Sequence, residues 1–206
     1  MTSTLRDLLI QRAARLQSQA ALSAPDWGTL SYAQLRNRVE GVALGLLSRE
    51  LPAASFSSTG TAWDWAAELA AAASGLMWSP AGQAVPSDTF GGCRFNHEDG
   101  RGPYHAREQV VQAATLFSAD LDHGEVMLRL RRLNRELGWD HTNRVDLPLA
   151  RLGEAPMRAA LWSALYAGAH AVLTEEAPST AKRFFTRFQS VPQAWDPGPF
   201  QDFWDV

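Results

Sequence analysis

The feature that most constrains this chain is the alternation of short extended stretches with longer stretches that have helical periodicity. Extended character is found at 53–58, 76–79, 144–149 and 169–174. Helical spacing of apolar residues follows or precedes each of them, at 31–46, 61–76, 125–137 and 155–168. Strands that alternate with helices are typical of an α/β fold. We therefore predict an α/β architecture, a layered sheet flanked by helices.

Three of the predicted helices begin at recognisable capping sequences. Thr4–Asp7, Ser31–Gln34 and Thr61–Asp64 each place a hydroxyl residue three positions before an acidic or amide residue, and this spacing pairs two side chains with free backbone N–H groups. Leu5, Leu9, Leu16 and Ala20 share a face at helical spacing, so the first helix is predicted to run through Ala20.

Length and composition indicate one globular domain. The 206 residues are 46% hydrophobic and carry a net charge of −3, which excludes intrinsic disorder and gives enough chain for a sizeable core. Residues 79–92 contain several Pro and Gly residues and are interpreted as an internal linker. We predict a single domain over 1–190, followed by a Pro-rich, aromatic tail over 191–206.

Charge and cysteine content limit the cellular locations and the classes of partner that we expect for this chain. Cys93 is the single cysteine, so no internal disulfide forms, and a reducing, cytoplasmic location is expected. No apolar stretch is long enough for a membrane span. The basic run Arg129, Arg131, Arg132 and Arg135 is interpreted as a solvated helix face. Nucleic-acid contact through this run is the less favoured alternative.

One glycine-containing turn, 99–103, is a candidate anion site because α/β folds bind phosphate where a strand leads into a helix. It lacks the spacing of both common phosphate-binding loops, and the competing interpretation is a solvent-facing turn. The candidate nucleotide- or anion-binding residues are His97, Gly100, Arg101, Gly102 and His105.

The same stretch holds a dense group of imidazoles and carboxylates, His97, Glu98, Asp99, His105 and Glu108. We interpret them as unconnected loop and capping residues rather than metal ligands. No nucleophile elbow is present, so the sequence predicts no catalytic residue, no metal site and no cofactor.

Aromatic residues in the tail are the candidate partner-binding residues. Phe200, Phe203 and Trp204 either pack against the domain itself or anchor a protein partner. Packing against the domain is favoured, because an exposed tail with this many aromatic rings promotes association.

The order of the segments resembles that of adenylate-forming enzymes, the acyl-CoA synthetase or AMP-binding superfamily. Within 4–47, LSYAQL at 30–35 is similar to the family's TYxEL segment. WDWAAELAAAASGLMWSP at 63–80 is similar to the family's helix, glycine and "vwvP" strand. The stretch 138–176, and FFTRFQSVPQAW at 184–195, are similar to the segments that follow in the family. The resemblance implies that this chain corresponds to the N-terminal half of the large domain of an acyl-CoA synthetase.

The departures from the family pattern bear on activity. The family's phosphate-binding loop is rich in Ser, Thr and Gly and ends in Pro-Lys-Gly, whereas 95–105 lacks these hydroxyls and the lysine and carries Glu98 and Asp99. Arg151 stands near the family's aromatic-site histidine. The family's adenine, magnesium and catalytic-lysine motifs would lie beyond residue 206, so catalysis is expected to be lost.

The resemblance and its departures together lead to one expectation and two alternatives. We expect a non-catalytic binding or assembly role, with a homo-oligomer or another protein as partner. The first alternative is residual acyl or nucleotide binding, or adenylation completed by another chain, through His97, Arg101 and His105. The second is nucleic-acid association through the 129–135 arginines.

Overall fold

A computed structural model describes residues 4–48, 54–55, 59–75, 78–79, 121–175 and 195–205. The predicted anion-binding residues His97, Gly100, Arg101, Gly102 and His105 lie outside these ranges, as does Cys93. The predicted boundary between the domain and its tail, at 190–191, also lies outside them.

The described strands form two sheets. The larger has the order β2–β1–β6–β5, with β2 (Gly28–Ser31), β1 (Ala20–Ala24), β6 (His170–Thr174) and β5 (Arg144–Pro148). β1 and β2 are antiparallel, whereas β6 is parallel to both β1 and β5. A smaller parallel sheet pairs β3 (Ala54–Ser55) with β4 (Trp78–Ser79). The predicted α/β architecture is confirmed, as a mixed four-stranded sheet flanked by helices.

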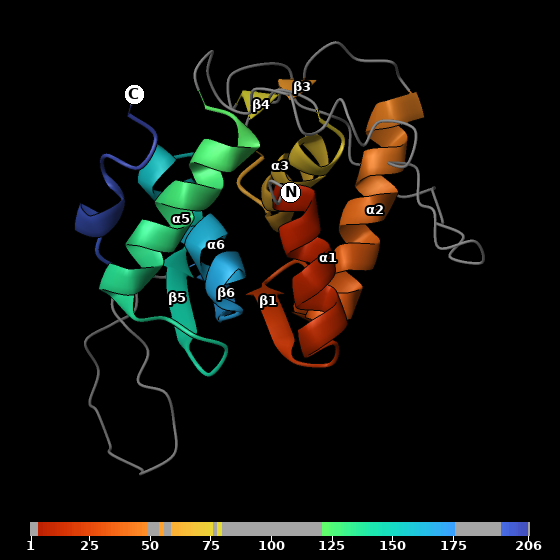
Figure 1. Ribbon diagram of the computed structural model, residues 1–206. Coiled ribbons are helices and arrows are strands. Elements are labelled where there is room, and N and C mark those ends of the chain that lie inside the picture. The colour runs from red at the N-terminus through yellow and green to blue at the C-terminus, as the bar shows by residue number, and fades with distance from the viewer. Residues whose placement is uncertain are drawn as a thin grey trace.

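The helices form two groups beside this sheet (Figure 1). One group packs α1 (Leu5–Leu16), α2 (Tyr32–Ser48) and α3 (Ala62–Ala73) against one another. The other packs α5 (His123–Leu137) against α6 (Ala155–Ala167), with the C-terminal segment alongside. Two short 3-10 turns complete the described elements, at Leu149–Arg151 and Gly198–Phe200. α6 connects the parallel strands β5 and β6, and it joins the two groups because it contacts α5 in one and α1 in the other.

Local capping explains where the N-terminal helices begin. The Thr4 hydroxyl accepts a hydrogen bond from the Asp7 N–H at 3.1 Å, and the Asp7 carboxylate accepts one from the Thr4 N–H at 2.9 Å. Ser31 and Gln34 make the same reciprocal pair at the start of α2. These two predicted capping boxes are confirmed. At α3 the Thr61 hydroxyl caps the helix, while the Asp64 carboxylate reaches back to the N–H groups of Thr59 and Gly60.

The prediction that α1 continues through Ala20 is wrong. The helix ends at Leu16, Gln17 turns the chain with a φ of 23°, and Ala20 begins β1. The sequence AALSA of β1 has no β-branched residue, so its strand character comes from pairing with β2 and β6 rather than from intrinsic preference.

The core lies between the helices and one face of the larger sheet. Leu22, Val145, Leu147, Ala171 and Leu173 point into it from three adjacent strands, since their paired registers place them on the same face.

Among the described residues, no helix has the length and apolarity that crossing a membrane requires.

Candidate functional site

The C-terminal strap, which we define as residues 195–205, lies on the surface formed by α5 and α6 (Figure 1). Phe200 and Phe203 are buried against the main core, and Trp204 is half-buried. Burying a Phe side chain fully stabilises a fold by roughly 1.5–3 kcal/mol. The strap is therefore held on its own chain, which is the arrangement that the sequence favoured; its role toward a partner stays a prediction.

Aromatic rings build the apolar part of this contact. The Phe200 ring stacks on Trp195, with ring centroids 5.6 Å apart and planes 10° apart, and its centroid lies 5.8 Å from that of Trp139. The rings of Phe203 and Trp204 meet edge to face at 4.6 Å. Such offset and edge-to-face contacts add specificity to simple burial because each fixes the orientation of the rings.

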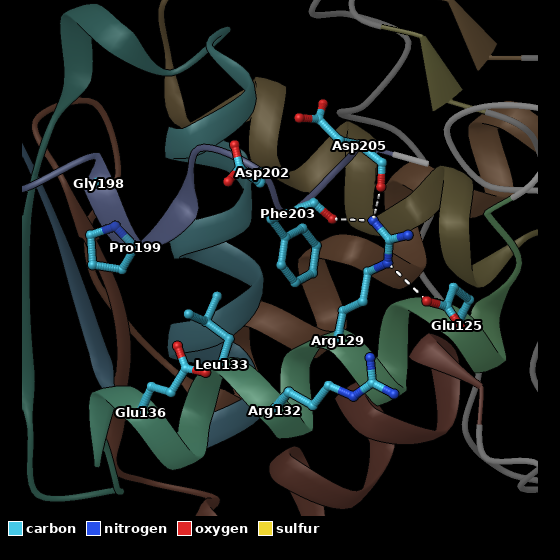
Figure 2. Close-up of a pocket in the computed structure, with 10 residues that line it drawn as sticks. All are labelled: Glu125, Arg129, Arg132, Leu133, Glu136, Gly198, Pro199, Asp202, Phe203 and Asp205. Atoms are coloured by element: carbon cyan, nitrogen blue, oxygen red, sulfur yellow. Dashed lines mark hydrogen bonds and ion pairs between the residues drawn. The ribbon is translucent and has the colours of Figure 1, made fainter.

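Arg129 of α5 supplies the main polar contact. Its Nη1 donates to the carbonyl oxygens of Phe203 at 2.7 Å and Asp205 at 2.5 Å, and its Nε donates to Glu125 at 2.9 Å (Figure 2). Its partners in the strap are backbone carbonyls, which any sequence with this backbone shape would present. The interpretation of the basic run as a solvated face therefore fails for Arg129, whereas Arg131, Arg132 and Arg135 are exposed as expected.

A pocket of about 390 Å³ opens where the strap meets α5. The Phe203 ring points toward α5 beside Leu133, while the carboxylates of Asp202 and Asp205 turn away from the helix (Figure 2). The lining residues are Glu125, Arg129, Arg132, Leu133, Glu136, Gly198, Pro199, Asp202, Phe203 and Asp205. The pocket belongs to the strap contact, since residues of α5 and of the strap line it together.

A buried ionic network lies behind the strap and joins α3 to α6. The guanidinium of Arg158 donates to both oxygens of the Glu68 carboxylate, at 2.9 Å and 3.0 Å, and the indole N–H of Trp162 donates to Glu68 at 2.8 Å. The Trp204 ring of the strap lies over Arg158, with 5.1 Å between the guanidinium carbon and the ring centroid. The Trp204 N–H donates to the Ala155 carbonyl at 2.7 Å. The strap therefore contacts the arginine of this ion pair directly.

Two of the described histidines, His123 and His170, have lowered pKa values. His123 is buried, and its Nδ1 accepts the free N–H of Leu5 at the start of α1, at 3.2 Å. Burial lowers the pKa of His123 to about 4. His170 is half-buried and its Nε2 lies 2.8 Å from the Ser23 hydroxyl, while burial and then Arg144 lower its pKa. Each of these imidazoles hydrogen-bonds a group on another element.

Within the described ranges, no three His, Cys, Asp or Glu side chains gather closely enough to hold an ion. The cluster considered from the sequence, His97 to Glu108, falls outside those ranges and is not placed.

Sequence reasoning missed the residues that hold the strap. The spacing of the basic run does not distinguish Arg129 from its exposed neighbours, and no local pattern links Trp139 or Trp195 to the tail contact. One signal was available: a basic helix and an aromatic tail in the same chain can meet when an arginine binds backbone carbonyls. The Glu68–Arg158 pair had no local signal, because its residues are far apart in the sequence.

No family model and no curated protein sequence matches this chain. Solved structures do match it. The o-succinylbenzoate CoA synthetase MenE from Bacillus subtilis has a TM-score of 0.61 and 14% identity, over 82% of this chain and 44% of that chain. A Mycobacterium tuberculosis fatty acyl CoA synthetase has a TM-score of 0.60 and 11% identity, over 83% of this chain and 44% of that one.

The N-terminal subdomain of Klebsiella oxytoca NpsA, in complex with anthranilyl-AMSN, has a TM-score of 0.60 and 14% identity, over 84% of this chain and 55% of that one. This chain thus spans about half the length of the solved structures it matches. At such identities the likeness concerns the fold. The chain shares the α/β fold of part of the N-terminal domain of adenylate-forming enzymes.

Proposed function

We propose that this chain is a non-catalytic, acyl-CoA synthetase-like domain that binds or assembles with protein. The observation that carries the proposal is the strap contact. Buried aromatic anchors and an arginine that binds main-chain carbonyls are the means by which protein surfaces recognise a protein segment. The surface of α5 and α6 has these features, and in this structure it holds a segment of its own chain.

The charges of the described core support the same proposal. Arg158 and Glu68 pair with one another, and Arg12 donates to the carbonyls of Leu165 and Tyr166 at the end of α6. These buried or half-buried groups join helices. The 97–103 stretch adds a second support from sequence, because Glu98 and Asp99 would repel a triphosphate.

Two measurements on the purified chain test the proposal. Light scattering after size exclusion, over protein concentrations from micromolar to millimolar, should show a molecular mass that rises above that of one chain. Isotope exchange between ATP and pyrophosphate, with a panel of carboxylic acids, should stay at background. A chain that keeps the monomer mass throughout and catalyses this exchange would contradict both parts of the proposal.

Nucleotide or acyl binding is the second candidate function, with adenylation completed by another chain. The likeness to structures that hold AMP or an acyl-adenylate, such as B. subtilis MenE with AMP, favours it. Isothermal titration with ATP, AMP and acyl-CoA separates the two candidates. Micromolar binding that disappears in Arg101→Ala would support this second function and assign the 97–105 stretch to it.

A further inference from the structure

The contacts that hold the strap can form equally well within one molecule or between two copies of the chain. Arg129 binds two carbonyl oxygens, Trp204 donates to the Ala155 carbonyl, and Phe200 packs against Trp139. Every one of these contacts is non-covalent and joins residues far apart in the sequence. We call the surface formed by Arg129, Leu133, Trp139, Ala155 and Arg158 the seat. An identical strap from another molecule would satisfy the seat equally well.

The strap depends on the seat for its burial. Its one described regular element is the short 3-10 turn Gly198–Phe200. A segment of this kind has no core of its own. The buried surface of Phe200 and Phe203 is apolar surface that has to be covered by α5 and α6. A strap that leaves its own seat therefore exposes two aromatic rings and uncovers the apolar residues of the seat. The uncovered seat fits the strap of a second copy.

Chain length permits the exchange. The described residues that follow β6 end at Glu175, and the strap begins at Trp195. At about 3.3 Å for each extended residue, the connection between them spans at most about 65 Å. That reach is larger than a small domain, so covalent geometry allows the strap to reach the seat of a neighbouring molecule.

We propose that the seat binds the strap of a second copy of this chain, so that two copies associate by exchanging straps. The inference rests on the proposed assembly role and names the surface that carries it. Exchange of an identical element makes the same contacts in the dimer as in the monomer, which is why it is a low-cost route to association.

Competition from the chain's own strap sets the concentration at which exchange is seen. A segment joined by a short linker acts on its own site at an effective concentration of roughly millimolar. Wild-type chains should therefore be mainly monomeric at micromolar concentration. Two variants, each defective on one side of the contact, remove this competition and reveal the exchange.

The experiment mixes a seat variant with a strap variant. Arg129→Glu places a carboxylate against the carbonyl oxygens of Phe203 and Asp205, beside Glu125, and so releases a normal strap. The double substitution Phe200→Ala with Phe203→Ala weakens the strap and frees a normal seat. Each variant alone should have the mass of one chain by light scattering at tens of micromolar. An equimolar mixture should have twice that mass.

The matched control uses Arg131→Glu, an equal charge change at an exposed position of the same helix. Its strap stays on its own seat, so its mixture with the strap variant should keep the monomer mass. If the double variant fails to fold by circular dichroism, Trp204→Ala replaces it, because this half-buried ring leaves both phenylalanines in place. Hydrogen exchange across α5 should then show protection that returns on mixing.

The outcomes separate this inference from the proposed function. A folded mixture that keeps the monomer mass, with no renewed protection of α5, would overturn strap exchange. If the wild-type mass still rises toward millimolar concentration in that case, assembly stands and uses another surface. If the mixture associates and the Arg131→Glu control does not, the seat and the strap are the interacting surfaces.

Discussion

Arg158 in the first turn of α6 pairs with Glu68 of α3, and Arg151 pairs with Glu154 just before α6. The two pairs differ chiefly in burial. Arg158 and Glu68 have side-chain exposures of 8% and 3%, whereas Arg151 and Glu154 have exposures of 41% and 43%. The shortest N···O distances are similar, at 2.9 Å and 2.7 Å. Distance alone would therefore rank the two pairs as equals.

The surroundings of each pair make them unequal. The carboxylate of Glu68 is buried away from water, so its hydrogen bonds have to come from the protein. It accepts three of them, from Arg158 and Trp162. The exposed pair exchanges contacts with water at little cost. The loss of one partner of a buried pair thus lowers the stability of the fold strongly, even where the intact pair contributes little net stability.

The largest expected effect is the loss of one partner of the buried pair. Arg158→Ala leaves the Glu68 carboxylate buried without its counter-ion, and the free energy of unfolding should fall by about 3–5 kcal/mol. Urea denaturation followed by circular dichroism measures this change. Glu68→Ala should have an effect of similar size, because it leaves a buried guanidinium.

A double substitution tests whether the stranded charge is the cause. Glu68→Leu together with Arg158→Met replaces the pair by apolar groups of similar volume, and most of the lost stability should return. If the double variant is as unstable as either single one, the loss came from packing and the interpretation of the pair is wrong.

His123 provides a second buried ionisable group, and its effect appears as a pH dependence. Its pKa falls to about 4 in the folded chain from 6.5, mainly because of burial. Between these values the unfolded chain binds a proton that the folded chain does not, so stability falls as the pH falls from 6.5 to about 4. The contribution should be about 3 kcal/mol, since each pKa unit corresponds to ~1.4 kcal/mol.

The measurement is urea denaturation at several pH values for wild type and His123→Gln. The variant should lose most of the decrease in stability between pH 6.5 and 4. His141→Gln, on an exposed turn, is the matched control and should keep the wild-type pH profile. Equal profiles for all three proteins would show that the protonation of His123 is not linked to folding.

The sequence was informative where structure is decided locally. Thr4, Asp7, Ser31 and Gln34 make the capping contacts that their spacing predicts, because capping needs residues only three positions apart. β1 was missed because AALSA has no intrinsic strand preference and becomes a strand only by pairing with the nearby β2 and with the distant β6. Strand character at Ala20–Ala24 thus depends on partners that a local pattern does not contain.

The candidate site was predictable to a smaller extent. The aromatic tail was recognised from composition, and Phe200 and Phe203 are indeed buried on their own chain. The residue that holds the strap, Arg129, could not be distinguished from Arg131 and Arg132 by spacing alone. What separates it is the position of the carbonyl oxygens of Phe203 and Asp205, which is a property of the tertiary structure.

The glycines that end α5 and α6 also differ in burial: Gly138 is exposed, whereas Gly168 is buried. Gly138 and Gly168 have φ values of 65° and 85°, so both occupy the left-handed region. A Cβ at Gly138 would meet no atom within 4 Å, whereas one at Gly168 would lie 2.8 Å from Cδ1 of Leu16.

Gly138→Ala should therefore cost roughly 1–2 kcal/mol, the strain of a left-handed alanine alone. Gly168→Ala should cost about 1 kcal/mol more, because the Leu16 side chain must also move. Thermal and urea denaturation of both variants measures the difference. Equal losses would mean that Leu16 adapts without cost, and a larger loss at Gly138 would contradict the interpretation.

The smallest effect is expected at the exposed pair. Arg151→Ala removes the ion pair with Glu154, but both side chains are accessible to water, and the freed carboxylate is solvated as soon as its partner is gone. The hydrogen bond to Glu154 raises the pKa of Arg151, yet arginine is charged at every accessible pH with or without it. The urea midpoint should thus stay within experimental error of wild type, at both low and high salt. A clear loss that high salt abolishes would show that the exposed pair contributes to stability, and the contrast with Arg158 would then rest on more than burial.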